Sequence, residues 1–277
     1  MNNKILVLGS TGKTGSRVYN LLKAGGHTAV PASRNSDIPF DWYERSTWAA
    51  SLEGIHSVYI TFQPDLSIPQ ALPLVTDFVN EAKAAGVSKL VLLSGRGEPE
   101  CVACENVIIN SGLDYTMLRC SFFMQNFSEG FWAEGIAAGE LVIPVVHAKE
   151  PFIDTDDIAA VAVAALTSES HNGKIYELTG PELLDFSQTV MKIAAGSGHR
   201  VSLQQVSMDS YVDALKNLIP DDYIALIRYL FEEVLDGRNE SVTTDVERVL
   251  GRPATTFDAF VSKAARNKAW TSNLQTA

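Results

Sequence analysis

The chain has 277 residues, 46% of them hydrophobic, and a formal net charge of −11 at pH 7. A chain of this length can bury a sizeable core, either as one large α/β domain or as a domain with a C-terminal extension. The negative charge, with no cluster of Lys and Arg to interrupt it, argues against nucleic acid and anionic membranes as partners. We see no membrane-length apolar stretch, no signal peptide and no disulfide framework among the three cysteines, so we expect a cytoplasmic protein.

A glycine-rich turn follows the first predicted strand, which covers residues 4–8. The turn has the spacing G-x-x-G-x-x-G, and a helical pattern of apolar residues follows at 16–24. A strand, a glycine turn and a helix in this order aim backbone N–H groups and the positive helix end at a pyrophosphate. The residues expected at this phosphate are Gly9, Ser10, Thr11, Gly12, Lys13, Thr14 and Gly15.

Residues 12–14 also resemble the end of a P-loop of nucleoside triphosphatases. That motif requires a further glycine at the position that Val7 occupies here, which argues against a triphosphatase.

Strands and helices then alternate along the chain. Strands are predicted at residues 28–32, 40–42, 57–61, 89–94, 114–119 and 175–178. Helices are predicted at 47–52, with Ser46 as its cap, and at 68–85, 99–110 and 156–167. This alternation predicts an α/β fold with a Rossmann-type, doubly wound parallel sheet.

The rhythm changes after Cys120. Shorter extended segments are expected at 141–144, 151–153 and 201–206, and helices at 208–217, 221–235 and 256–268. We expect residues 1–120 to form an NAD(P)-binding core. We expect residues 121–277 to return to that core and to form a smaller α/β lid that binds substrate over the carboxyl ends of the strands.

The end of the second predicted strand bears on cofactor choice. Sites for NAD usually place Asp or Glu there to hold the ribose hydroxyls, whereas this chain has Ser33 and Arg34. A guanidinium and a hydroxyl suit a 2′-phosphate, and Lys13 can add a second positive charge. We therefore expect NADP(H) to be preferred, with NAD(H) as the alternative. The alternative for Arg34 is an ordinary exposed arginine, and Asp41 either binds the adenine amino group or caps a turn.

Several segments together resemble the NmrA-like branch of atypical short-chain dehydrogenases, and the resemblance runs to about Trp270. The segments that carry it are the glycine turn, Ala32-Ser33-Arg34, Phe40-Asp41-Trp42, Ser46-Thr47-Trp48, and residues 111–119, 122–126, 154–159 and 178–182. The chain looks most like the ergot-alkaloid iminium reductases, and more distantly like triphenylmethane reductase and quinone oxidoreductases. The family also contains non-catalytic NAD(P) sensors that act through protein contacts.

The resemblance implies a nicotinamide cofactor lying across the strand ends and an apolar small-molecule substrate. It places Thr61, Phe62 and Gln63 at the adenine and its ribose, and Ser94, Gly95 and Arg96 at the nicotinamide ribose. It places Ser121, Phe122, Phe123 and Asn126 at the nicotinamide or the mouth of the substrate site. The aromatic side chains of Phe122, Phe123, Phe127, Phe131 and Trp132 form either a substrate wall or core.

Typical short-chain dehydrogenases carry Tyr-x-x-x-Lys as a proton-donor pair where this chain has Cys101 and Glu105. This difference favours hydride addition to an iminium, a triarylmethane-type cation or a quinone over alcohol oxidation. Glu105 is the one catalytic candidate, although an exposed helix carboxylate is the slightly favoured interpretation. Cys101 and Cys104 are either a redox pair or, as we favour, incidental, and no metal site is expected. An NADPH-dependent reductase and a non-catalytic sensor both remain open.

Overall fold

The computed structural model describes residues 3–271. They form two compact units, each made of several stretches of chain. The first unit reaches to Cys120 and also takes in Thr155–Leu178 and Asp245–Arg252. The second unit holds Ser121–Asp154, Thr179–Thr244 and the described residues from Pro253 onward. The division into a cofactor-binding core and a substrate lid remains a prediction.

A six-stranded sheet with the order β2-β1-β3-β4-β5-β7 forms the middle of the first unit, and every neighbouring pair of strands is parallel. The strands are β1 (Lys4–Leu8), β2 (Ala29–Ala32), β3 (Ile55–Ile60), β4 (Lys89–Gly95), β5 (Asp114–Cys120) and β7 (Lys174–Leu178). Most apolar side chains of the inner strands β1, β3, β4 and β5 are buried because helices cover both faces, as is typical of parallel sheets. The predicted Rossmann-type sheet is confirmed.

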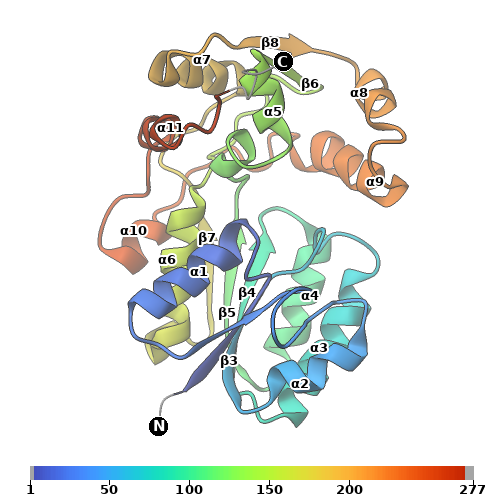
Figure 1. Ribbon diagram of the computed structural model, residues 1–277, viewed down its shortest axis with the longest axis vertical. Coiled ribbons are helices and arrows are strands. Elements are labelled where there is room, and N and C mark those ends of the chain that lie inside the picture. The colour runs from blue at the N-terminus through green and yellow to red at the C-terminus, as the bar shows by residue number, and fades with distance from the viewer. Residues whose placement is uncertain (1–2, 272–277) are drawn as a thin grey trace. The chain divides into compact units, whose positions relative to one another are not determined.

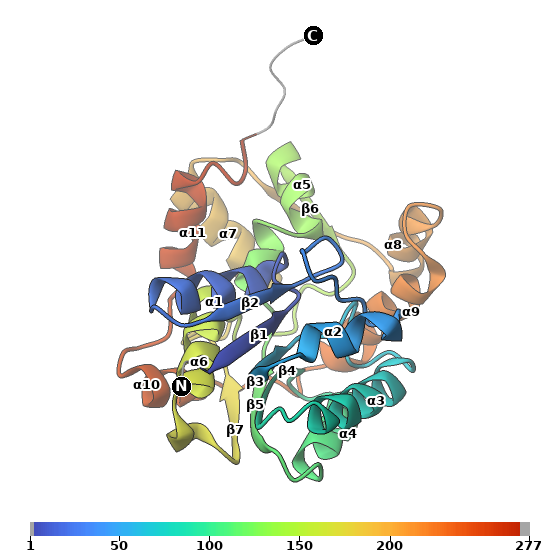
Figure 2. The same cartoon turned by 60° about the horizontal axis from the view of Figure 1, so that its bottom comes forward.

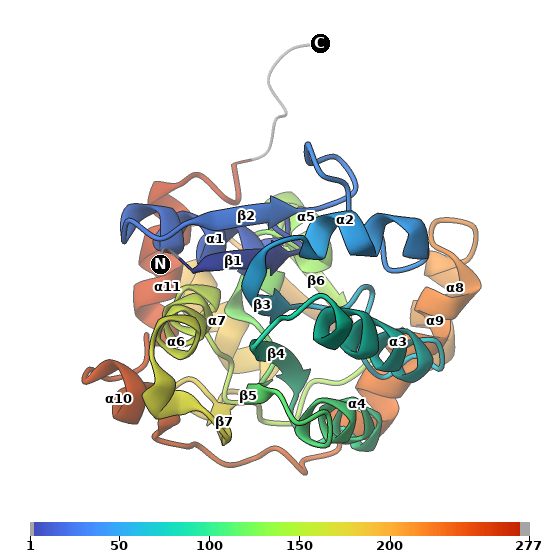
Figure 3. The same ribbon diagram turned by 90° about the horizontal axis from the view of Figure 1, so that it is seen from below.

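Helices lie on both faces of this sheet (Figures 2 and 3). One face carries α1 (Lys13–Ala24), α6 (Thr155–Thr167) and α10 (Asp245–Leu250). The other carries α2 (Trp48–Leu52), α3 (Ala71–Ala84) and α4 (Pro99–Ile109). Because parallel strands all end at the same edge, the loops that follow β1 to β5 gather there, where open α/β sheets bind ligands.

The second unit is built around an aromatic core that includes Phe127, Trp132, Phe152, Phe186 and Phe257. Its α-helices and strands, labelled in Figure 1, are α5 (Phe131–Ala138), β6 (Glu140–Ile143), α7 (Phe186–Ser197), β8 (Ser202–Gln205), α8 (Met208–Leu215), α9 (Asp221–Tyr229) and α11 (Phe257–Arg266). It also contains η2 (Met124–Phe127) and the π-helical η4 (Leu230–Val234). Strands β6 and β8 pair in parallel. None of the helices within residues 3–271 combines the length and the apolar composition that a membrane crossing requires.

Two local predictions are wrong. Residues 40–42 form a turn with a single bridge between Asp41 and Glu44, not a strand of the sheet. The aromatic residues there pack on one another, with the Phe40 and Trp42 ring centroids 5.2 Å apart. Ser46 is not a helix cap, because the Glu44 side chain accepts a hydrogen bond from the Ser46 backbone N–H and caps the short η1 (Arg45–Thr47) instead.

Candidate functional site

The glycine turn brings the end of β1 and the start of α1 very close together. Gly9 has a φ of +62°, a left-handed conformation that glycine adopts without strain. The Gly12 backbone N–H donates to the Gly9 carbonyl oxygen at 2.8 Å. A Cβ at Gly15 would overlap the Gly9 carbonyl and lie 2.9 Å from the Leu8 carbonyl oxygen. Glycine is therefore required at the first position of the motif by its φ angle, and at the third position by the close approach of backbone carbonyl groups.

The N-terminus of α1 is open to an anion. Its N-cap is Gly12, which offers no side-chain acceptor, and no acidic residue stands in the first turn of this helix. The N-cap residue therefore places no side chain over this helix end, where the positive end of the helix dipole lies. Thr11 is exposed and Lys13 half-buried, whereas Ser10 and Thr14 are buried. This set fits the pyrophosphate of a dinucleotide.

Arg34 follows β2 directly and is exposed. It makes no hydrogen bond or ion pair with any residue from 3 to 271, so its guanidinium is free for a phosphate. Ser33 holds the turn, because its carbonyl oxygen accepts from the Phe40 backbone N–H at 3.0 Å. The Asp41 carboxylate accepts from the Tyr43 backbone N–H at 2.9 Å, which favours its interpretation as a turn aspartate.

The end of β3 lies beside the glycine turn. Thr61 Oγ1 is 2.6 Å from the point where a Gly9 Cβ would stand, and Gln63 Nε2 is 3.9 Å from the corresponding point at Gly12. Thr61 and Phe62 are buried, while Gln63 is exposed. The Thr61 carbonyl oxygen accepts from the Trp42 indole N–H at 2.9 Å, which ties this strand end to the loop after β2. The predicted residues of β1, β2 and β3 therefore gather at one edge of the sheet.

Glu105 is fully buried, so its interpretation as an exposed helix carboxylate is wrong. Its Oε1 accepts from Ser94 Oγ at 2.6 Å and from Arg119 Nε at 2.9 Å, and its Oε2 accepts from Arg119 Nη2 at 2.6 Å. A buried carboxylate of this kind is stable only with a cation and hydrogen bonds around it. The hydrogen bond to Glu105 raises the pKa of Arg119.

A second ion pair continues this network at the neighbouring strand end. Arg96 Nε lies 3.0 Å from Glu177 Oε2, and Arg119 Nη1 lies 3.9 Å from Glu177 Oε1. Arg96 itself is buried, while Gly95 is half-buried. The sequence analysis had named neither Arg119 nor Glu177 as site residues. Each is a charged residue in the last part of a predicted sheet strand, which is the signal that would have identified them.

The three thiols are buried and free of disulfides. Burial raises the pKa of Cys104 to about 11, and it raises the pKa of Cys101 and of Cys120 as well. A redox pair needs a thiolate at neutral pH, usually through a lowered pKa. The burial of Cys101 and Cys104 has the opposite effect, because it raises the pKa of both thiols.

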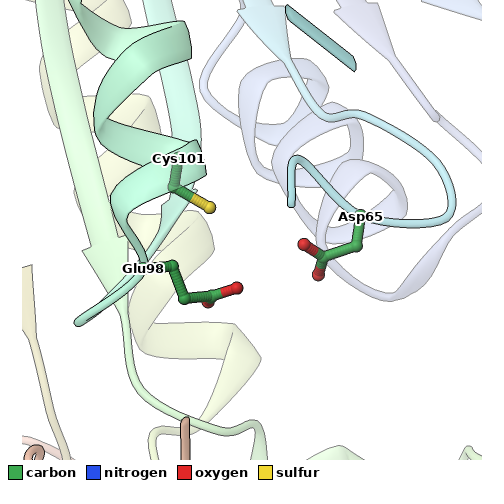
Figure 4. Close-up of side chains that lie close together, drawn as sticks. All are labelled: Asp65, Glu98 and Cys101. Atoms are coloured by element: carbon green, nitrogen blue, oxygen red, sulfur yellow. The ribbon is translucent and has the colours of Figure 1, made fainter. Parts of the chain in front are cut away.

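Figure 4 shows that Cys101, from the first turn of α4, points toward Glu98 and toward Asp65 of the loop after β3. One potential ligand atom from each side chain lies within 4.8 Å of the other two. Burial raises the pKa of Asp65. No metal-binding spacing in the sequence relates Asp65 to Cys101, so sequence analysis could not have identified this cluster.

The residues predicted at the substrate lie in the second unit. Ser121 is buried, and Phe122, Phe123 and Asn126 are half-buried. Phe122 packs against the aromatic core, to which Phe127 and Trp132 belong. Phe127 and Trp132 are therefore core residues, which is one of the two interpretations given for the aromatic set. The Phe131 side chain lies outside what the structure describes.

No family model matches the chain. The chain is 30% identical to the uncharacterized oxidoreductase YesF of Bacillus subtilis, over 98% of this chain and 97% of that protein. It is 29% identical to festuclavine synthase I of Penicillium roqueforti, over 92% and 96% of the two chains. Among solved structures, the NADPH complex of an NADPH-dependent quinone oxidoreductase of Escherichia coli superposes with a TM-score of 0.78 at 23% identity, covering 94% of this chain and 99% of that one.

Proposed function

Because this chain belongs to the NmrA-like family of atypical short-chain dehydrogenases and is an oxidoreductase, we propose that it reduces an apolar, electron-poor small molecule with NADPH. The acceptor class is an iminium, a triarylmethane-type cation or a quinone. Its relatives include a festuclavine synthase, and an NADPH-dependent quinone oxidoreductase shares its fold.

Three features of the first unit support NADPH as the cofactor. Gly12 leaves the N-terminus of α1 open to a pyrophosphate, and the tight packing at Gly15 fixes that helix against β1. The free guanidinium of Arg34 follows the neighbouring strand β2 and is matched to a 2′-phosphate. When bound, the cofactor supplies a hydride from C4 of its nicotinamide.

The proposed acceptor class rests on the burial and the bonding of the Cys101 and Glu105 side chains. The Cys101 thiol is buried and its pKa is raised, so it is a poor acid at neutral pH. The Glu105 carboxylate is fully buried, and its two oxygens accept hydrogen bonds from Arg119 and Ser94, so they are already engaged within the protein. Neither group supplies the proton that reduction of a simple carbonyl needs, whereas a hydride added to a cationic carbon needs none at that step.

The proposal is tested with NADPH deuterated at C4, in separate pro-R and pro-S forms, and a panel of iminium, triarylmethane and quinone acceptors. We expect one of the two forms to deliver deuterium to carbon in a cationic acceptor, as measured by mass spectrometry of the product. Simple secondary alcohols with NADP⁺ serve as the control and should give no reduced cofactor. Tight NADPH binding with no deuterium in any cationic acceptor, and with no oxidation of NADPH by the quinones, would instead favour the non-catalytic sensor.

The double substitution Cys101→Ser/Cys104→Ser should leave NADPH-dependent turnover per folded molecule unchanged. Each substitution buries a hydroxyl in place of a thiol, so the free energy of unfolding should fall, by about 1–3 kcal/mol for each hydroxyl left without a partner. Activity is measured before and after oxidation with diamide, beside urea unfolding. Oxidative inactivation that dithiothreitol reverses in the native protein, and that the double variant lacks, would establish a redox pair instead.

A further inference from the structure

A continuous set of polar contacts joins the carboxyl ends of three neighbouring strands. Ser94 of β4 is in register with Arg119 of β5, and Arg119 is in register with Glu177 of β7. Glu105 reaches this row from α4, through its hydrogen bonds to Ser94 and Arg119. Two carboxylates, those of Glu105 and Glu177, therefore face the guanidinium groups of Arg119 and Arg96.

Arg119 is the member of this network with a donor to spare. Its Nε and Nη2 are both used by Glu105. Its Nη1 donates no hydrogen bond to any residue between 3 and 271, and 24% of the side chain is exposed. A guanidinium fixed on one edge by a carboxylate presents its other edge with little loss of side-chain entropy.

The order of the strands shows which part of a dinucleotide would reach Arg119. The glycine turn follows β1, and the free guanidinium of Arg34 follows β2. With the adenosine phosphate at β2, the other half of the molecule runs in the opposite direction, across the end of β3 toward β4 and β5. Arg119 stands at the end of β5, beside Ser94 of β4.

We propose that Arg119 binds the nicotinamide half of the cofactor, with Nη1 donating to a hydroxyl oxygen of the nicotinamide ribose. Glu105 is then a positioning residue, which acts only by holding Arg119. This inference rests on the proposed NADPH-dependent function and deepens it.

The test compares two ligands that differ in the nicotinamide half. NADPH and adenosine 2′,5′-bisphosphate, which lacks the nicotinamide ribose, are titrated by calorimetry into the native protein and into Arg119→Met. The Kd of NADPH should rise about tenfold or more, as expected when a hydrogen bond to a charged donor is lost, while the Kd of the bisphosphate stays unchanged.

Arg252→Met is the matched control. Arg252 also pairs with a fully buried carboxylate of the first unit, that of Asp157, at 2.7 Å. Its removal tests the general effect of breaking such a pair and should alter neither Kd. Circular dichroism monitors the folding of each variant. If Arg119→Met does not fold, Arg119→Lys is compared with the native protein in its place. The Kd of NADPH should then rise only about threefold, because the charge remains.

Glu105→Gln tests the positioning role. Glu105→Gln should raise the Kd of NADPH by part of the amount seen for Arg119→Met. When it is added to Arg119→Met, the Kd of NADPH should not rise further, since Glu105 acts only through Arg119. Equal losses for both ligands, or no loss for either, would overturn the inference, and so would a raised KM for the acceptor with an unchanged Kd for NADPH. A native protein that binds no NADPH would overturn the proposed function itself, whereas unchanged NADPH binding by a folded Arg119→Met overturns only the inference.

Discussion

Gly15→Ala is expected to weaken NADPH binding by at least about a hundredfold and to destabilise the protein by about 2–4 kcal/mol. The added methyl group would overlap the Gly9 carbonyl and crowd that of Leu8, so α1 must move away from β1. The shift carries the open N-terminus of α1 away from the pyrophosphate it is built to meet. Calorimetric titration and thermal unfolding, with and without NADPH, measure the two effects.

Gly25→Ala is the control for this prediction. Gly25 caps the other end of the same helix with an ordinary φ of −77°, and an added Cβ would meet first the His27 ring, at 3.1 Å. A side chain can move where a carbonyl cannot, so both the NADPH affinity and the stability should remain near those of the native protein. Native-like NADPH binding by Gly15→Ala would show that the turn does not hold the cofactor.

Arg34→Ala should weaken NADPH binding by about 10- to 100-fold and leave NADH binding nearly unchanged. Only the 2′-phosphate distinguishes the two cofactors, and Arg34 makes no hydrogen bond or ion pair with residues 3–271 that its loss could disturb. The native preference for NADPH should also weaken as salt is added, because an exposed ion pair is screened. Fluorescence titrations of both cofactors at two salt concentrations give all of these values.

Arg248→Ala is the matched control, since Arg248 is another exposed arginine of the first unit, on α10. It should change the affinity for neither cofactor. Equal Kd values for NADPH and NADH in the native protein would rule out a role for Arg34 in selecting the cofactor.

The parallel sheet could be predicted because its signals are local. Short apolar runs such as residues 4–8 and 89–94 are ended by turns, and helical patterns lie between them. The structure places β1 and β4 within a residue of these predictions. The strand predicted at residues 40–42 is wrong for a related reason. Aromatic residues are common in strands, but Phe40 and Trp42 pack on a helix instead.

The second unit was harder to predict. Helix α7 was missed although Asp185 and Gln188 form a capping box at its start, a signal that is readable in the sequence. Helix α5 was not predicted, and its aromatic residues were assigned only to a substrate wall or to core. The predicted helix 221–235 is real up to Tyr229 and continues as the π-helical η4, a change of hydrogen bonding that no composition signals.

At the site, the sequence could show which residues follow strand ends but not which of them pair. A glutamate in a helix is usually exposed, and nothing local in the sequence marks Glu105 as buried. Only the register of β4 with β5 brings Ser94 and Arg119 to it. Contacts between distant residues depend on this register and on the packing of α4. A single sequence does not encode them in any local pattern.

The stretches that make up the two units also constrain how the chain can fold during its synthesis. The chain passes from one unit to the other after residues 120, 154, 178, 244 and 252. A ribosome that has released only the first 120 residues has not yet made α6, α10 or β7, so one face of the sheet is covered by α1 alone and β5 remains an edge strand. Apolar surface and unpaired backbone groups of this kind promote aggregation. The six-stranded sheet thus cannot be completed before residues 121–154 of the second unit have been made, and its assembly is a long-range event.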